Sequence, residues 1–397
     1  KVHENSGEEK LRRNPRLVWL IGVTAIMVML ILGISQRDHI RGALFTNQTA
    51  QSELSESTPL IPSGNSTSPS SPQSNNQDQS IVTKTESPPS QTPENQSSTQ
   101  NIGGGSGQIA YASNYEDSVM QLWVMSVDGS NKQKITNLSD GACQPDWSPD
   151  GNKIVFISPC NAKKDTYDGA RIFILDTTQS NLIIPADIPI DPSGDFDPIW
   201  SPDGQKIAFS SFRPGNHPIS KERMIHIYIF DLINNSLTEI TDTRWRDRHP
   251  AWSNDSSRIA FSRKIAYNEI WILEIDSLES FQFASRGNVN LLYPYWGLND
   301  EYIFYTNQNI SSGSLPYFLS KKSDETLGST EFRIPPSGQQ TFSPSVDSVV
   351  SPDGQWFVFE SWPDGVNHDI YIATTNGAKL TQLTSEKSFE FSPAWRP

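Results

Sequence analysis

Residues 197–211 read DPIWSPDGQKIAFSS, and related versions of this stretch recur as far as the C-terminal end of the sequence. A short segment ends at a tryptophan, a Ser-Pro-Asp-Gly sequence follows, and a run of β-branched and aromatic residues comes next. Proline fixes φ at the second position of a turn, and glycine accepts a positive φ. Each copy therefore predicts a β-hairpin.

The sequence contains six copies of this unit, 44 to 54 residues apart. The shared position is occupied by Trp147, Trp200, Trp252, Trp296, Val350 and Trp395. Most hairpins are followed by a third and a fourth apolar run, for example residues 227–230 (IYIF) and 237–240 (LTEI). Four antiparallel strands repeated at this interval are typical of β-propeller blades.

The two ends of the repeat region complement each other. Residues 108–111 (QIAY) match the second strand of a unit, whereas residues 392–395 (SPAW) match a first strand alone. We therefore predict an all-β, six-bladed β-propeller over residues 108–397, closed by one C-terminal strand beside three N-terminal strands. Closure of this kind removes the exposed sheet edges that promote aggregation.

An apolar stretch of 19 residues, 17–35, has no ionisable side chain. As a helix it would be about 28 Å long, close to the roughly 30 Å hydrocarbon core of a bilayer. We interpret it as a transmembrane helix and uncleaved signal anchor, because no cleavage site of small residues follows it. A cleaved signal peptide is the alternative.

The charges that flank this helix predict its orientation. Lys10, Arg12, Arg13 and Arg16 precede it, and only Arg37 and Arg41 follow it closely. The positive-inside rule makes residues 1–16 a cytoplasmic segment and places the propeller outside the membrane, in the periplasm or the extracellular space. Residues 36–107, rich in Ser, Pro, Gln and Asn, are expected to form a disordered linker.

The Trp-Ser-Pro-Asp-Gly turn, followed by Ile-Ala-Phe-x-Ser, resembles the WD40-like repeat of the TolB propeller family. The resemblance covers residues 108–397 and is clearest around Trp147 and Trp200. Around Trp252 and Trp296 the proline is lost and the glycine is displaced, so different turns are expected there. The resemblance implies an extracytoplasmic propeller that binds proteins or small ligands, although the N-terminal α/β domain of TolB itself has no counterpart here.

The charge of the chain excludes one class of partner. The net charge is −14, and residues 108–397 contain 23 Lys and Arg against 36 Asp and Glu. Such an acidic domain repels phosphate backbones, so we expect no nucleic-acid binding.

The motifs of common catalytic sites are absent from the sequence. It contains no Gly-x-Ser-x-Gly, no phosphate-binding Gly-x-x-x-x-Gly-Lys and no His-Glu-x-x-His. The six histidines show no i, i+4 ligand spacing. We therefore predict no catalytic residues, no cofactor and no metal site. The acidic stretch 191–197 is interpreted as a solvated turn in preference to a Ca²⁺ loop.

Propeller geometry suggests a different kind of site. The first strand of each blade is innermost, so the residue three positions before each repeat tryptophan should lie at the mouth of the central channel. These six positions are Gln144, Asp197, His249, Tyr293, Asp347 and Ser392. We predict that they form a ligand-binding ring; the alternative is that they cap strands around a water-filled channel.

The two cysteines flank the first complete hairpin. Cys143 starts its first strand and Cys160 follows its second, so folding about the turn should place them opposite each other. Outside the cytoplasm they are expected to form a disulfide.

These features together predict a membrane-anchored extracytoplasmic propeller that acts as a non-catalytic module and binds a protein or a small-molecule or glycan ligand. Two alternatives remain at this stage. One is a carbohydrate-active lyase or hydrolase that uses the channel-mouth residues. The other is the sensor half of a truncated receptor kinase.

Overall fold

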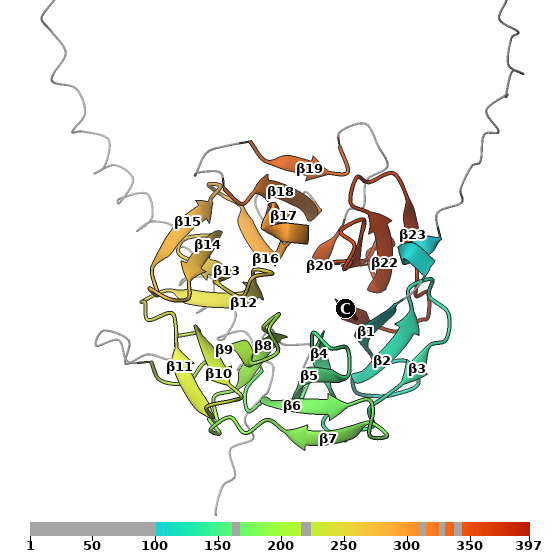
Figure 1. The fold of residues 1–397 in the computed structure, drawn as a ribbon. Helices are drawn as coiled ribbons and strands as arrows, with labels where there is room; N and C mark the ends of the chain where they lie inside the picture. Colours follow the sequence, from blue (N-terminus) through green and yellow to red (C-terminus); the bar gives the residue numbers. More distant parts are fainter. Residues whose placement is uncertain are drawn as a thin grey trace, which may run out of the picture. The chain divides into compact units, whose positions relative to one another are not determined.

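The six-bladed ring predicted from the repeats is confirmed by a computed structural model, which describes residues 101–105, 107–160, 167–215, 224–309, 315–324, 330–336 and 344–397. Within these residues, six four-stranded antiparallel sheets surround a common centre (Figure 1). The predicted transmembrane helix, residues 17–35, and most of the predicted linker lie outside the described residues. Among the described residues, no helix is both long and apolar enough to span a bilayer.

The six sheets are numbered as blades 1 to 6 in chain order. Blade 1 contains β24 (Glu390–Trp395), β1 (Gln108–Ser113), β2 (Gln121–Ser126) and β3 (Gln133–Lys134), and blade 2 contains β4 (Cys143–Trp147), β5 (Lys153–Ser158), β6 (Arg171–Asp176) and β7 (Leu182–Pro185). Blade 3 contains β8 (Asp195–Trp200), β9 (Lys206–Ser211), β10 (His226–Asp231) and β11 (Ser236–Glu239), and blade 4 contains β12 (Arg246–Trp252), β13 (Arg258–Lys264), β14 (Asn268–Glu274) and β15 (Ser280–Ala284). Blade 5 contains β16 (Asn290–Trp296), β17 (Tyr302–Gln308), β18 (Tyr317–Lys322) and β19 (Phe332–Ile334), and blade 6 contains β20 (Val346–Val350), β21 (Trp356–Ser361), β22 (Asp369–Thr374) and β23 (Leu380–Gln382).

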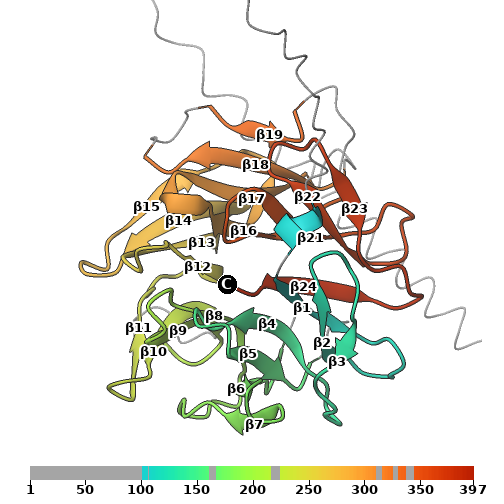
Figure 2. The same ribbon diagram turned by 45° about the vertical axis from the view of Figure 1, so that its right-hand side comes forward.

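Blade 1 closes the ring as expected from the two ends of the repeat region. The C-terminal strand β24 pairs antiparallel with β1, with Trp395 opposite Ile109 (Figure 2). Beyond the strand, the guanidinium of Arg396 donates hydrogen bonds to Gln108 Oε1 at 2.7 Å and to the carbonyl oxygen of Gly151 at 2.8 Å. The C-terminal segment therefore connects β1 of blade 1 to the turn of blade 2.

The hairpin turns are held by their serine and aspartate. Ser201 Oγ donates to Asp203 Oδ1 at 2.5 Å and accepts the backbone N–H of Lys206 at 2.9 Å. The turns that begin at Ser148, Ser253 and Ser351 repeat this arrangement. The expectation of a different turn after Trp252 is therefore wrong: Ser256 takes the left-handed conformation that glycine takes elsewhere, with φ 61°. The turn after Trp296 does differ, because it forms the short 3₁₀ helix η2 (Leu298–Asp300).

The repeat tryptophans are part of the core between neighbouring blades. Trp200 of blade 3 packs in one cluster with Val155 of blade 2, and Trp395 of blade 1 packs with Trp356 of blade 6. The five repeat tryptophans are 3% to 7% exposed. Burial of such large apolar side chains stabilises each contact between blades.

The ordered region begins before the predicted boundary at residue 108. A 3₁₀ helix, η1 (Ile102–Gly105), lies within the predicted linker, and Ile102 packs against the core shared by blades 1 and 6. Gly103 has φ 61°, and a Cβ at this position would lie 2.6 Å from Val127 Cβ. The glycines at the end of the linker thus allow the backbone to approach the propeller closely.

Deletion of residues 392–397 should destabilise the full chain, because it removes most of β24 and the Arg396 contacts. The point variant Trp395→Ala should lower the free energy of unfolding by roughly 3–5 kcal/mol. Ile233→Ala, at a side chain that is 73% exposed, should change it by less than about 0.5 kcal/mol. Chemical denaturation and size-exclusion chromatography measure both effects. A truncated chain that remains monomeric with unchanged stability would contradict closure through β24.

Candidate functional site

The six predicted ring residues share an unusual backbone conformation. Gln144, Asp197, His249, Tyr293, Asp347 and Ser392 all have a positive φ, between 49° and 54°. Each of them lies where the pairing between the first and second strands of its blade shifts register. Each first strand therefore contains a β-bulge at its predicted mouth residue.

The residue that follows explains these bulges. Proline occupies this position in five of the six blades, and Ser348 occupies it in blade 6. Proline has no N–H to donate to the neighbouring strand, so it is accommodated in an edge strand, such as the innermost strand of a blade, where pairing is interrupted. A bulge with a left-handed residue also changes the direction of that side chain. The x-Pro-x-Trp sequence thus marks the bulge in five blades, and blade 6 forms the same bulge with Ser348.

The bulges bring all six ring residues to a single cavity. They line a space of about 190 Å³ at one end of the channel, together with residues that include Arg248 and Glu360. Each ring residue is partly exposed. The structure thus assembles the six residues at one site.

Asp197 has polar contacts with residues of three neighbouring blades. Gln144 Nε2 donates to Asp197 Oδ1 at 2.9 Å, and the Asp197 N–H donates to Gln144 Oε1 at 2.8 Å. Arg248 Nε donates to Asp197 Oδ2 at 3.2 Å, and Ser210 Oγ donates to the same oxygen at 3.0 Å. Burial alone would raise the pKa of Asp197, but the charges of Arg248 and His249 and these hydrogen bonds lower it to about 2. Asp197 is therefore a permanent anion that links blades 2, 3 and 4.

Further contacts continue around the ring. The backbone N–H of His249 donates to Asp197 Oδ2 at 3.3 Å, and the imidazole of His249 lies 4.2 Å from the ring of Tyr293 between centroids. On the opposite side, the hydroxyl of Ser392 is hydrogen-bonded to Asp347. The mouth residues thus hold one another in place across blade boundaries.

Asp347 has the opposite electrostatic character to Asp197. Burial raises its pKa, the negative charge of Glu360 raises it further, and the resulting value is about 7. Burial also raises the pKa of Glu360, against the effect of the adjacent His368. This half of the cavity therefore contains two carboxyl groups whose pKa values are raised.

The sequence reasoning missed a second row of side chains behind the ring. Ser210, Ser262 and Glu360 each lie ten residues after the repeat position of their blade. Ser210 hydrogen-bonds to Asp197, Ser262 Oγ lies 3.4 Å from His249 Nδ1, and Glu360 acts on Asp347. This constant spacing places them on the second strand of each blade, beside the bulge. The same spacing can be read from the repeat, so these residues could have been predicted from the sequence. Arg248, which directly precedes the ring residue His249 and contacts Asp197, was also missed.

Residues directly before the repeat positions lie between two cavities of the channel. Asp146, Ile199, Ala251, Tyr295 and Val349 line both the mouth cavity and a second cavity of about 300 Å³ on the side of the hairpin turns. Burial raises the pKa of Asp146 to about 7, although the carboxylate accepts the backbone N–H of Trp200 at 2.7 Å. A third carboxyl group with a raised pKa thus lies below the mouth.

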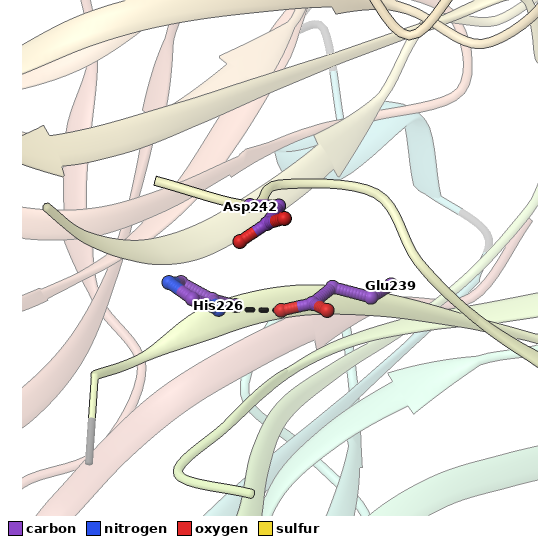
Figure 3. A group of neighbouring side chains, drawn as sticks. All are labelled: His226, Glu239 and Asp242. Carbon is purple, nitrogen blue, oxygen red and sulfur yellow. Dashed lines mark hydrogen bonds and ion pairs between the residues drawn. The ribbon is translucent and has the colours of Figure 1, made fainter. Parts of the chain in front are cut away.

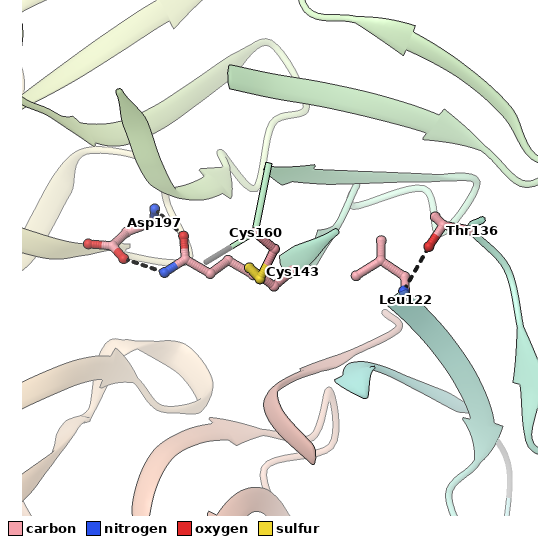
Figure 4. The surroundings of a disulfide bond; sticks show 6 residues. Leu122, Thr136, Cys143, Cys160 and Asp197 are labelled. Carbon is pink, nitrogen blue, oxygen red and sulfur yellow. Dashed lines mark hydrogen bonds between the residues drawn. A yellow bond between two sulfur atoms is a disulfide. The ribbon is translucent and has the colours of Figure 1, made fainter. Parts of the chain in front are cut away.

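A disulfide joins Cys143 and Cys160 at the mouth end of blade 2, with the Cα atoms 5.6 Å apart (Figure 4). Cys143 directly precedes the ring residue Gln144, whose side chain is bonded to Asp197. The disulfide therefore fixes the start of β4 next to the ring.

The acidic stretch 191–197 was interpreted as a solvated turn, and this is wrong for two of its three carboxylates. Asp195 is buried and forms an ion pair with Arg213 at 2.7 Å, and Asp197 belongs to the ring. Asp191 Oδ1 accepts the N–H of Ser193 at 2.8 Å. The three carboxylates thus have separate partners and do not converge on one ion.

One group within the described residues has a donor set that suits a metal ion. It consists of His226, Glu239 and Asp242 of blade 3 (Figure 3). These residues are outside the predicted ring, and the expectation of no metal ligands did not anticipate them.

The closed ring of six sheets around a polar mouth defines the class of six-bladed β-propeller proteins. A family described as the TolB beta propeller domain matches residues 99–350, more than half of the chain. The chain therefore belongs to the TolB β-propeller domain family, as the repeat sequence indicated.

Similar proteins cover parts of the chain. It is 30% identical over 113 residues to the uncharacterized protein Atu1656 of Agrobacterium fabrum, which is 27% of this chain and 38% of that protein. It is 27% identical over 126 residues to the uncharacterized peptidase YuxL of Bacillus subtilis, which is 32% of this chain and 18% of that protein. The chain thus spans less than half of the length of either relative.

Solved structures share the fold. TolB from Acinetobacter baumannii superposes with a TM-score of 0.57 and 19% identity, covering 73% of this chain and 67% of that one. A putative TolB from Agrobacterium tumefaciens superposes with a TM-score of 0.54 and 15% identity, covering 74% and 100% of the two chains. At these identities the similarity concerns the fold alone.

The raised pKa of Asp347 predicts a measurable pH dependence of stability. The folded protein holds this proton more tightly than the unfolded chain, so the contribution of Asp347 to the unfolding free energy falls as pH rises from about 4 to about 7. Asp347→Asn should make the dependence shallower over this range, whereas Asp276→Asn, at an exposed carboxylate, should leave it unchanged. Denaturant titrations at several pH values test this. An identical slope for wild type and Asp347→Asn would contradict the proposed environment.

Proposed function

We propose that the chain is a membrane-anchored extracytoplasmic propeller that binds a partner through the mouth of its channel, without a covalent step. The observation that carries this proposal is the convergence of six side chains, one from each blade, on one cavity. Rigid inner strands hold these side chains, so little conformational entropy is lost on binding.

The size of the cavity limits what can enter. Its volume of about 190 Å³ is below the roughly 300–1,000 Å³ that is usual for sites enclosing drug-sized ligands. A single long side chain, a chain terminus or a part of a sugar fits this space better than a whole cofactor does. We infer that the ligand is a projecting group of a larger partner, most simply a segment of another protein.

The charges of the cavity favour a basic group. Its lining contains four acidic side chains and one arginine, Arg248. The acidic residues are Asp146, Asp197, Asp347 and Glu360. Arg248 is already paired with Asp197 and His368 with Glu360, so we infer that Asp347 attracts the cation, next to the negative charge of Glu360. The net charge of −14 would also accelerate the approach of a basic partner.

The location outside the membrane rests on the apolar segment 17–35, on its flanking charges and on the disulfide. Disulfides persist in oxidising compartments and are rare in the cytosol. The linker of residues 36–107 would allow the domain to reach partners some distance from the membrane, on the order of 45 Å for its length.

The disulfide provides a test of location in living cells. Cys143 and Cys160 should be oxidised when thiols are trapped with acid and alkylated with a mass-tagged maleimide before any reduction. The full chain should then take up no tag, and it should take up two tags after reduction. Two tags without prior reduction would place the propeller in a reducing compartment and would contradict the extracytoplasmic location.

Binding to the mouth can be tested with a defined probe. A fluorescent hexapeptide with one lysine should bind the full chain at least about tenfold more tightly than the same peptide with N-acetyllysine. Its affinity should rise as pH increases through about 7, because Asp347 loses its proton in this range.

Two pairs of variants locate the contact. Asp347→Asn and Glu360→Gln should each lower the affinity for the lysine peptide by about tenfold. Asp276→Asn and Glu279→Gln, at exposed carboxylates, should leave this affinity unchanged. Equal binding of the two peptides, or equal losses in all four variants, would contradict a basic ligand at the mouth.

One observation favours the second candidate, a carbohydrate-active lyase or hydrolase. The pKa values of Asp146 and Asp347, both about 7, suit a general acid at neutral pH. Cleavage of neutral or acidic oligosaccharides by the wild-type chain, with loss of this activity in Asp347→Asn, would select the enzyme over the binding module.

A further inference from the structure

Three potential metal ligands meet at the outer part of blade 3. His226 begins β10, Glu239 ends the neighbouring strand β11, and Asp242 follows three residues later. Their nearest ligand atoms all lie within 4.8 Å of one another (Figure 3). The side chains of His226 and Glu239 are 1% and 5% exposed, and Asp242 is exposed to solvent.

Both ring nitrogens of His226 face a hydrogen-bond acceptor. Its Nδ1 lies 2.5 Å from Glu239 Oε1, and its Nε2 lies 2.7 Å from the carbonyl oxygen of Thr243. Both partners are hydrogen-bond acceptors, but a neutral imidazole has a single N–H. The carbonyl of Thr243 requires this N–H at Nε2, so the lone pair of Nδ1 faces the carboxylate. A positive charge between Nδ1 and Oε1 resolves the conflict, either as a second proton or as a metal ion.

The contact with Thr243 is of the kind that orients a metal-binding histidine. Histidine ligands almost always donate their second N–H to a carbonyl or a carboxylate, which fixes the tautomer and the ring. Here the donor to Thr243 is Nε2, which leaves Nδ1 as the ligand atom.

The surrounding backbone is shaped around the pair. A Cβ at Gly215 would lie 2.5 Å from Glu239 Oε1 and 2.7 Å from His226 Nδ1. Glycine therefore allows the chain to cover the two ligand atoms closely, while Asp242 faces solvent. The pair is thus covered at Gly215, and the third ligand, Asp242, is exposed to solvent.

We propose that His226 Nδ1 and the carboxylates of Glu239 and Asp242 bind a divalent transition-metal ion of the Zn²⁺ type. Ca²⁺ and Mg²⁺ prefer ligand sets made of oxygen, whereas one imidazole nitrogen with two carboxylates suits Zn²⁺. Three protein ligands leave the fourth tetrahedral position to water.

Binding requires small movements of these side chains. With bonds of about 2.0–2.1 Å, ligand atoms of a tetrahedral site lie about 3.3 Å apart. His226 Nδ1 and Glu239 Oε1 must therefore separate by about 0.8 Å, and Asp242 must move closer to them. Asp242 is free to do so at the surface, and the proton between His226 and Glu239 would be released.

The proposed metal site is separate from the channel mouth. It lies on the two outer strands of blade 3, whereas the ring residue Asp197 lies on the inner strand β8. Asp242 belongs to the segment that leads into β12, which carries Arg248, the partner of Asp197. A bound ion would tie this segment to blade 3 at a point shortly before Arg248.

Titration of the metal-free full chain with Zn²⁺ in a calorimeter tests the proposal. The chain, dialysed against a chelator and then into buffer, should bind one Zn²⁺ at this site, with proton release and a higher unfolding temperature. Asp242→Asn should weaken this binding at least about tenfold. Because Asp242 is exposed, this variant should fold even if His226→Gln does not.

The matched control is His368→Gln in blade 6. His368 Nδ1 contacts Glu360 Oε1 in a similar pair, but within the described part of the chain no third ligand completes it. Zn²⁺ affinity should therefore be unchanged in this variant. Absence of saturable Zn²⁺ binding to the wild-type chain, or equal affinity in wild type and Asp242→Asn, would overturn the proposal and identify His226 and Glu239 as a simple ion pair.

Discussion

The pairing of β24 with β1 joins the two ends of the described region in one sheet, and the geometry of the channel depends on this contact. Each inner strand contributes one residue to the mouth, so the six residues share a cavity because the six blades form a closed ring. Arg396 reinforces the closure by bonding to Gln108 and to the turn of blade 2. The buried repeat tryptophans pack between neighbouring blades. Their burial is a large apolar contribution to the stability of the ring.

A second constraint acts within each blade. In five of the six blades a proline after the mouth residue interrupts strand pairing, and in every blade a bulge turns the mouth side chain through a left-handed backbone conformation. A non-glycine residue in this conformation raises the free energy of the folded chain by about 1–2 kcal/mol. All six mouth residues adopt it. The second strand then places a polar residue such as Ser210 or Glu360 behind it. The short unit x-Pro-x-Trp therefore serves both the packing of the blades and the arrangement of the site.

Much of this organisation could be predicted from the sequence, because the repeat reports equivalent positions directly. The blade number, the closing strand and the six mouth positions follow from the spacing of Trp147 and its counterparts. The charge states of the site could not be predicted in this way. Asp197 and Asp347 occupy equivalent positions, and burial raises the pKa of both. Arg248 and His249 nevertheless lower the pKa of Asp197 to about 2, whereas burial and the charge of Glu360 raise that of Asp347 to about 7. These neighbours vary from blade to blade, so periodicity does not reveal them. The group around His226 was missed because its ligands come from two adjacent strands and a loop, with no characteristic spacing.

The most direct test of the account is the titration of these two carboxyl groups by carbon-13 NMR of the full chain labelled at aspartate. Each value depends on groups from neighbouring blades, Arg248 and His249 of blade 4 for Asp197 and Ser392 of blade 1 for Asp347. The closed ring predicts a pKa of about 2 for Asp197 and about 7 for Asp347, with the assignments made from Asp197→Asn and Asp347→Asn. Two ordinary values near 4 would show that the mouth residues do not meet as described, and would contradict the functional proposal built on them.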